Sequence, residues 1–447
     1  MAQGQAQAHG PVVRWVQRVV DVQDEELQTL LLSAAYFFLI LTAYYIIRPI
    51  RDEMGVAGGV DNLPWMFTGT LVLMLLVNPP FAAIVARFSR KGFVSISYRF
   101  FMSNLVIFFI LLKVLPPDAQ IWVGRAFYWW VSIFNLFVVS IFWAFMSDVW
   151  KTGQSKRLYG FIGVGGTLGN LLGASITTAL ATFIEPAFLL LLSVVLLEAA
   201  VWIVLRLSKV FESLRVARGE ERLETKRIGG SMWAGITHVF SSPYLLGIAC
   251  YMLGYTIVGT VLYVQQADIA SQIADRGLRT AFFGGIDSAV AVLTIVTQVF
   301  LTGRFIKWVG VAVALTFLPL ICIIGFAALG FWPAAVVIVV FQVLRRAANF
   351  AIARPAKETL FTVVTREDRF KAKPFIDTAV YRAGDQVGVW SEWFLGRIGF
   401  GVAGVAFIMI PIAGLWLMVG YWLGLQQTAR LERDRAAEAA AAEAAPA

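Results

Sequence analysis

Long apolar runs recur along nearly the whole chain of 447 residues, and they limit the folds open to it. A helical run of about 19 residues or more, rising 1.5 Å per residue, crosses the roughly 30 Å of hydrocarbon in a bilayer. We count about twelve runs of this length. They start near Leu30, Trp65, Ser95, Ile121, Tyr159, Ala187, Tyr244, Phe282, Val311, Pro333, Pro374 and Val402. The sequence therefore predicts a protein that crosses a membrane many times.

The composition agrees with this reading and selects helices as the spanning elements. Hydrophobic residues make up 59% of the chain, charged residues only 15%, and the mean hydropathy is +0.74. Lipid tolerates only helices or closed barrels as spanning structures, and the ten-residue alternation of an outer-membrane barrel is absent from the sequence. We therefore expect an all-α, polytopic membrane protein with about twelve transmembrane helices.

A polar connection over residues 209–231 divides the runs into six and six, which is the layout of a two-bundle transporter. The basic turn Arg87-Phe-Ser-Arg90 follows the second run, and a similar turn from Arg304 to Lys307 follows the eighth, as in a duplicated unit. The predicted parts are an N-terminal bundle (1–208), a cytoplasmic linker (209–231), a C-terminal bundle (232–425) and a cytoplasmic tail (426–447). A solute site is expected where the halves meet.

Lys and Arg gather in alternate connections between the runs, and such residues are enriched on the cytoplasmic side. This places both termini in the cytoplasm, most simply across a bacterial inner membrane. The net charge of +9 then has a membrane explanation, so the lipid bilayer is an expected partner and nucleic acid is not. Met1 to Gly10 does not resemble a cleaved signal. We expect the protein to act as a monomer.

Charged and polar residues inside the runs are the candidate functional residues, because each costs about 2.5–3.5 kcal/mol at a helix centre unless it faces a cavity or a partner. In the tenth run these are Arg345, Arg346 and Asn349; in the eleventh, Asp377, Arg382 and Asp385; and in the eighth, Asp287. The arginines are predicted either to contact a solute or gate it, or to pair structurally with carboxylates such as Asp377 or Asp385. Glu198 in the sixth run is expected to be structural.

The first run ends in two tyrosines followed by Arg48, Arg51 and Asp52. These arginines are either an ordinary interfacial anchor or, if the helix is long and kinks at Pro49, cations that reach inward. A guanidinium's planar fork suits phosphate or carboxylate. The spacing leaves both alternatives open.

Two other features have competing interpretations. The charged stretch between the tenth and eleventh runs contains Lys357, Glu358, Lys371 and Lys373, which form either a cytoplasmic gate or an ordinary basic loop. The glycines from Gly160 to Gly173 look like a phosphate loop, but no strand precedes them and an apolar helix continues after them. Gly165, Gly169 and Gly173 therefore predict close helix packing. We expect no metal site, no cofactor and no enzymatic activity.

The segment from Asn349 to Gly388 resembles the ATP:ADP antiporter family, the nucleotide exchange transporters of plastids and intracellular bacteria. The shared residues are Pro355, Lys357, Glu358, Glu367, Asp368, Lys371, Lys373, Ile376, Asp377, Gly384 and Gly388. Other stretches are similar in order and spacing: Tyr45 to Asp52, Phe142 to Tyr159 with the glycines that follow, and Phe282 to Ala289. The resemblance covers most of the chain in collinear order.

This resemblance implies a fold related to the major facilitator architecture, which exchanges anionic, phosphate-bearing solutes by alternating access without hydrolysing them. Two departures bear on specificity. The family's lysine in the first helix is Arg51 here, and its glutamate in the fourth helix falls on Val131 or Ser132. The alternatives are a proton-coupled symporter or exporter that uses Asp377, Asp385 or Glu198, and a permease-like partner or receptor that carries no solute.

Overall fold

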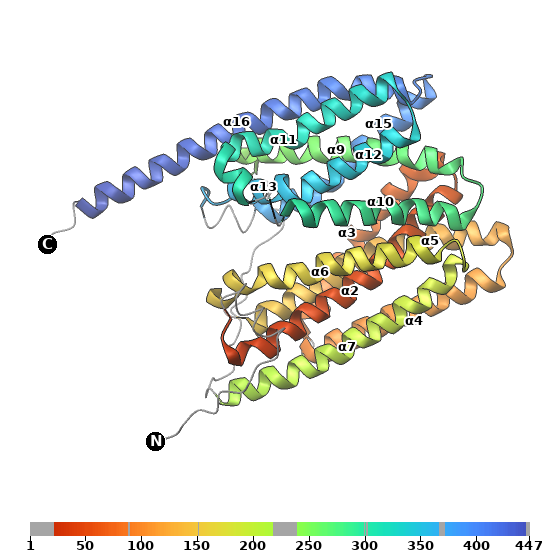
Figure 1. The fold of residues 1–447 in the computed structure, drawn as a ribbon, viewed down its shortest axis with the longest axis horizontal. Coiled ribbons are helices and arrows are strands. Elements are labelled where there is room, and N and C mark those ends of the chain that lie inside the picture. Colours follow the sequence, from red (N-terminus) through yellow and green to blue (C-terminus); the bar gives the residue numbers. More distant parts are fainter. Residues whose placement is uncertain are drawn as a thin grey trace. The chain divides into compact units, whose positions relative to one another are not determined.

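The computed structural model describes residues 22–87, 90–150, 152–217, 239–298, 300, 303–365 and 372–443, and these residues form helices without strands (Figure 1). The first six helices are α2 (Asp24–Ala57), α3 (Leu63–Arg87), α4 (Arg90–Val114), α5 (Pro117–Val149), α6 (Thr152–Leu180) and α7 (Pro186–Ala217). The remainder are α9 (Pro243–Ser271), α10 (Arg276–Thr297), α11 (Gly303–Phe331), α12 (Ala335–Ala348), α13 (Arg354–Leu360), α15 (Tyr381–Arg397) and α16 (Val402–Glu443). The predicted all-α class is confirmed.

Within the described part of the chain, 10 helices are long and apolar enough to cross a bilayer. Two further segments have the length but carry more polar residues: α6, with 29 residues, and the helical stretch 372–397 that contains α15. Every predicted apolar run begins at or near one of these helices. The protein is therefore an integral, multi-pass membrane protein.

The helices group into two compact units, and each unit is assembled from three separate stretches of the sequence. The first unit comprises residues 1–54, 72–224 and 275–288; the second comprises 55–71, 225–274 and 289–447. The first part of α10 thus belongs to the first unit, and residues 63–71 of α3 belong to the second. The six-and-six division of the sequence remains a prediction. Helix α7 continues through Ala217 into the expected linker, and residues 218–238 lie outside the described residues.

In the first unit, α4 packs on α5 and α7, and α6 packs on α2 through glycines. A Cβ added at Gly165, Gly169 or Gly173 would lie only 2.5, 2.3 or 2.4 Å from a main-chain oxygen of α2. These oxygens belong to Ala34, Phe38 and Thr42. Real Cβ atoms do not approach backbone so closely, so only glycine permits this contact over two consecutive helical turns. The predicted small-residue packing of this segment is confirmed.

The second unit is built around α9, which packs on α15 and α16, and α11, which packs on α16, with α12 against both α9 and α11. Its core contains Leu245, Phe326 and Ala406, which are all fully buried. The part of α3 that belongs to this unit is attached through Thr68. The Thr68 hydroxyl donates to Gln386 at 2.9 Å and accepts from the Trp390 indole at 3.2 Å. Both partners lie on α15, so this part of α3 is held by hydrogen bonds as well as by packing.

π-helical turns interrupt the second unit at two positions where polar residues concentrate. One, Asn349–Ala353, joins α12 to α13, and the other, Ile376–Val380, leads into α15. Single π-turns inside α-helices are rare and are found frequently at functional sites, because they leave backbone groups and side chains out of the usual register. Asn349 and Asp377, two of the predicted site residues, lie in these turns.

Candidate functional site

Arg48, Arg51 and Asp52 lie inside α2, which continues through Pro49 and ends only at Ala57. The side chains of Arg48 and Arg51 are 20% and 15% exposed, and that of Asp52 is 4% exposed. A snorkelling interfacial anchor would leave the guanidinium in water. These three residues are packed into the protein instead, so the inward-reaching alternative fits the structure better.

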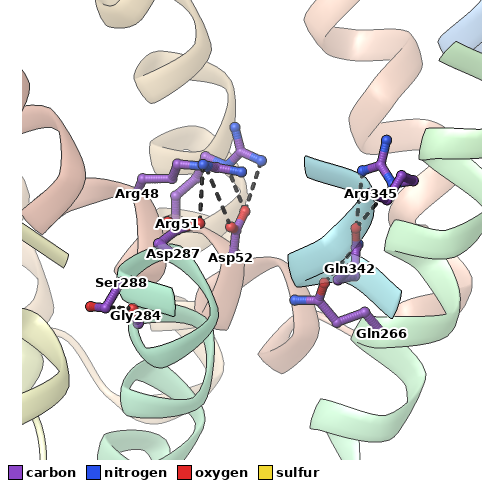
Figure 2. Close-up of polar contacts among 9 residues, drawn as sticks. All are labelled: Arg48, Arg51, Asp52, Gln266, Gly284, Asp287, Ser288, Gln342 and Arg345. Atoms are coloured by element: carbon purple, nitrogen blue, oxygen red, sulfur yellow. Dashed lines mark hydrogen bonds and ion pairs between the residues drawn. The ribbon is translucent and has the colours of Figure 1, made fainter. Parts of the chain in front are cut away.

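Carboxylates compensate both arginines of α2 (Figure 2). Nη1 of Arg48 lies 3.2 Å from Oδ1 of Asp287 on α10, and Nη2 of Arg51 lies 2.7 Å from Oδ1 of Asp52. Nε of Arg48 is also 4.0 Å from Oδ2 of Asp52. Asp287 is only 2% exposed, so its charge requires a partner of this kind. The predicted gating residue Asp287 and the predicted binding residue Arg48 therefore form one ion pair.

Aromatic rings surround these guanidinium groups. The Arg51 guanidinium lies 4.5 Å from the ring centroid of Tyr128 on α5, and that of Arg48 lies 5.6 Å from Tyr45. Tyr44 and Tyr45 meet edge to face, with centroids 5.2 Å apart. Cation–π contacts of this kind hold an arginine while leaving its N–H groups able to bind an anion. Sequence analysis missed Tyr128, because nothing in α5 indicated that it lies beside α2.

A further carboxylate, Glu53 on α2, forms ion pairs with two more arginines. Its Oε1 lies 3.3 Å from Nε of Arg276 and 2.9 Å from Nη2 of Arg279, both in the first turn of α10. Glu53 is 1% exposed. The sequence did not mark Glu53, Arg276 or Arg279 as candidate site residues. The available signal was an acidic residue placed one position after Asp52 within an otherwise apolar helix.

Arg345 in the second unit has a different environment (Figure 2). Its Nη2 and Nε donate to Oε1 of Gln342 at 2.9 and 3.3 Å, and Gln342 in turn donates to Gln266 on α9 at 2.8 Å. Arg345 is 7% exposed. Gly259 on α9 makes room for the guanidinium, because a Cβ there would lie 3.0 Å from Nη1. Among the described residues no carboxylate pairs with Arg345.

The neighbouring polar residues of the tenth run lie on α12 and on the π-turn that follows it. Arg346 is half-buried, and Asn349, the first residue of the π-turn, donates its amide to the Tyr255 hydroxyl on α9 at 3.0 Å. Tyr255 also approaches Tyr381, with ring centroids 6.2 Å apart. The π-turn therefore links the tenth and eleventh predicted runs through the tyrosines of α9 and α15.

Arg382 forms an ion pair with Asp385, one of the two carboxylates that the sequence offered as its partner. Nη1 of Arg382 lies 3.0 Å from Oδ2 of Asp385, and the other carboxylate oxygen accepts from the Thr260 hydroxyl at 2.9 Å. Asp385 is 7% exposed and Arg382 is 30% exposed. This carboxylate therefore has a partner on both oxygens, while the Arg382 side chain is partly exposed.

Ion pairs also link the two sides of the charged stretch 354–377. Nζ of Lys357 on α13 lies 2.7 Å from Oδ1 of Asp377 in the second π-turn. Lys373 pairs with Glu358 and lies 5.5 Å from the Phe361 ring. These contacts connect the end of one span with the start of the next. Lys371, predicted with them, lies outside the described residues.

Glu198, expected to be structural, has two partners that the sequence did not predict. It pairs with Arg99 of α4 at 2.9 Å and accepts the Trp202 indole N–H at 3.1 Å. The described residues contain no group of three or more His, Cys, Asp or Glu side chains that could hold a metal ion.

The family model of the Major Facilitator Superfamily matches residues 29–364, well over half of the chain. The chain belongs to this superfamily. Solved structures of two bacterial transporter homologues agree on the fold. A bacterial homologue of the iron transporter ferroportin in an inward-facing state aligns with a TM-score of 0.61 at 11% identity, covering 91% of this chain and 99% of that one. A bacterial homologue of the lysosomal transporter Spinster gives a TM-score of 0.56 at 13% identity over 91% and 99% of the two chains.

Curated relatives of this superfamily member confirm the resemblance found in the sequence. ADP,ATP carrier protein 1 of Chlamydia pneumoniae is 21% identical over 493 residues, which cover 93% of this chain and 95% of that protein. The protein of the same name from Chlamydia trachomatis serovar D is 23% identical over 469 residues, or 88% and 87% of the two chains. At the departure noted in the fourth predicted helix, Val131 is fully buried and Ser132 donates to the Tyr128 carbonyl.

Proposed function

We propose that this chain exchanges nucleotides or closely related phosphate-bearing anions across the membrane by alternating access. Its similarity to ADP,ATP carriers along about nine-tenths of its length supports this substrate class. The side chains inside its spans support an anionic substrate independently, because largely buried arginines lie in both units, Arg48 and Arg51 in the first and Arg345 in the second.

The observation that carries the proposal is Arg345. It is a nearly fully buried cation in a spanning helix, and its hydrogen-bond partner is the amide of Gln342. An amide fixes the orientation of a guanidinium but leaves its unit charge uncompensated. A buried cation is costly in a membrane and persists where it faces a functional partner. A phosphate group would supply the missing negative charge.

Arg48 and Arg51 form the corresponding anion-binding group of the first unit in this proposal. Each has carboxylate contacts at present, and a phosphate would compete with Asp52 and Asp287 for the same N–H groups. Arginine suits this exchange because its planar fork binds a carboxylate or a phosphate with similar geometry. Tyr44, which meets Tyr45 edge to face, gives this group an aromatic surface suited to a nucleobase.

Alternating access requires contacts that close one membrane face and then the other. Glu53 with Arg276 and Arg279 lies at the end of the first span, where the basic-residue distribution predicts the outer face. Lys357 with Asp377 lies at the end of the tenth predicted span, at the cytoplasmic face by the same rule. We propose these ion pairs as the outer and inner gates. A solute that neutralises the arginines in both end states lowers the barrier between them.

The proposal also includes the orientation of the protein in the membrane and its oligomeric state. Both termini are placed in the cytoplasm of a bacterial inner membrane, which the alternation of basic connections supports. The protein is proposed to work as a monomer. No catalytic step is assigned to it, since the superfamily it belongs to and its curated relatives are transporters.

Proteoliposomes test this function directly. Vesicles preloaded with ADP should take up labelled ATP, empty vesicles should not, and collapsing a proton gradient should leave the rate unchanged. Replacing Arg345 with alanine should lower exchange at least about tenfold, the effect of losing about 1.4 kcal/mol of binding. The matched control is Arg397→Ala, which removes an exposed arginine stacked on Trp393 at the end of α15.

Other results would replace this proposal. Uptake into empty vesicles that depends on a proton gradient would identify a proton-coupled transporter. Each carboxylate considered for that role already has a cationic partner: Asp377 has Lys357, Asp385 has Arg382, and Glu198 has Arg99. Equal exchange by the Arg345→Ala and Arg397→Ala variants would remove Arg345 from the site. A protein that binds a partner but transports nothing would be a receptor.

A further inference from the structure

A groove of about 670 Å³ lies on the surface of the first unit, between α2 and α7, and the proposed transport function does not use it. Its walls are mainly apolar, with Leu39 from α2 and Val194, Val195 and Ile203 from α7. Val195 and Trp202 are 64% and 67% exposed, so this face of α7 is not covered by other described helices. The volume falls within the ~300–1,000 Å³ typical of small-ligand sites.

The depth of the groove in the membrane follows from helix geometry. Counting from Pro186 at the predicted outer end of α7, a helix crosses about 30 Å of hydrocarbon in about twenty residues, which ends near Arg206. Arg206 therefore lies at the level of the cytoplasmic headgroups. Glu198 precedes it by about 12 Å of helix and so lies within the acyl region. The groove runs from the acyl region up to the headgroups.

The charges along the groove are unequal. Glu198 is neutralised by Arg99, with side chains 36% and 55% exposed, and Trp202 donates to the same carboxylate. Arg206 also lines the groove and is exposed, and among the described residues no carboxylate pairs with it. The groove therefore carries one net positive charge, and that charge is located at its headgroup end.

We propose that this groove is a binding site for one anionic glycerophospholipid of the cytoplasmic leaflet. An acyl chain lies along Val194, Val195 and Ile203, and the lipid phosphate contacts the Arg206 guanidinium. Basic residues at the cytoplasmic ends of grooves between spanning helices attract anionic headgroups. A second copy of the chain fits less well, because the polar pair on this face is already satisfied internally and leaves only a cation for a partner to meet.

Native mass spectrometry of the purified protein with added phosphatidylglycerol or phosphatidylcholine tests the site. We expect one phosphatidylglycerol to bind in preference to phosphatidylcholine. Arg206→Ala should weaken that binding about fivefold, the contribution of one basic residue near an anionic surface. The matched control is Arg433→Ala, which removes another exposed cation, on α16 in the second unit, and should leave the preference unchanged.

A second variant separates the groove from general surface charge. Ala199→Phe keeps every charge but fills the groove, since Ala199 lines it between Glu198 and Trp202. It should lower phosphatidylglycerol binding as Arg206→Ala does. Equal losses in the Arg206→Ala and Arg433→Ala variants, unchanged binding in Ala199→Phe, or displacement by soluble glycerol phosphate alone would overturn the proposal. A dimer that resists added lipid and is lost in Ala199→Phe would assign the face to a second copy.

Discussion

Arg48 and Arg51 of the first unit and Arg345 of the second unit have different kinds of partner. In the first unit Arg48 and Arg51 contact the carboxylates of Asp287 and Asp52 at 3.2 and 2.7 Å. In the second unit Arg345 donates to the neutral amide of Gln342 at 2.9 Å, and no carboxylate among the described residues pairs with it. The first group is electrostatically balanced without a solute, and the second is not. Anion binding is therefore expected to be driven mainly by the second unit, with the first unit responding by exchange of partners.

This difference also separates stability from transport. Removing a carboxylate from the first unit leaves a buried cation uncompensated, so the cost should appear in folding. Adding a carboxylate to the second unit should improve its electrostatic balance while it occupies the place of the solute. Variants that remove a carboxylate from the first unit or add one to the second unit test this difference.

The largest effect is expected for Asp287→Asn, which makes the first unit resemble the second. Arg48 then loses its carboxylate on α10, and breaking a buried ion pair from one side costs about 3 kcal/mol. Thermal unfolding in detergent should show a lower melting temperature that added nucleotide partly restores. The control Asp118→Asn changes an exposed residue in the first turn of α5 and should have little effect. A melting temperature equal to that of the control would contradict the role of this pair.

The converse variant, Gln342→Glu, makes the second unit resemble the first. A carboxylate in hydrogen-bond contact with Arg345 would compete with an anionic solute, and exchange should fall about a hundredfold. The melting temperature should not fall. The control is the same substitution at Gln266, which accepts a hydrogen bond from Gln342 and does not hydrogen-bond to the guanidinium. Gln266→Glu should lower exchange less than Gln342→Glu does. Transport at the parental rate in Gln342→Glu would show that Arg345 does not meet the solute.

A smaller effect is expected for Glu53→Gln, at the proposed outer gate. The amide keeps hydrogen bonds to Arg276 and Arg279 but loses the charge, which weakens the contact by about 2 kcal/mol. The outward-open population should rise, and labelling of cysteines introduced near this gate would report it. The corresponding change Asp377→Asn should act in the opposite direction. Identical labelling patterns in the two variants would rule out gates at opposite faces.

The smallest effect is expected for Thr260→Val. It removes one hydrogen bond to Asp385 and leaves the ion pair with Arg382 intact, so stability should fall by about 1 kcal/mol. Exchange should change little, and both properties can be measured on one preparation. Abolished exchange with normal stability would place Thr260 and Asp385 in the solute path.

The fold could be predicted almost entirely from sequence, because the bilayer requires long apolar helices and each run left a direct signal. The glycine contacts of α6 were also predictable, since small residues spaced by four serve few other purposes in a spanning helix. The π-turn at Asn349 could not be predicted. Its hydrogen-bond register depends on packing against α9, which no local pattern records.

The candidate residues were found by their charge, but their partners were not. Arg382 with Asp385 is a local pair, three residues apart, and sequence suggested it. The contact of Arg48 with Asp287 joins residues far apart in the sequence and became visible only in the structure. Glu53 was not predicted as a site residue, because the neighbouring Asp52 was interpreted as the carboxylate at the end of the first run. Sequence thus shows which charges are buried, and the structure shows which of them remain uncompensated.

The glycine contacts between α6 and α2 have a consequence for motion. Helices whose backbones touch at Gly165, Gly169 and Gly173 have no room to slide or tilt against each other. Spin labels placed one on each helix would keep a constant separation throughout the transport cycle. The constant distance between α2 and α6 therefore serves as a reference for measuring displacements elsewhere in the protein.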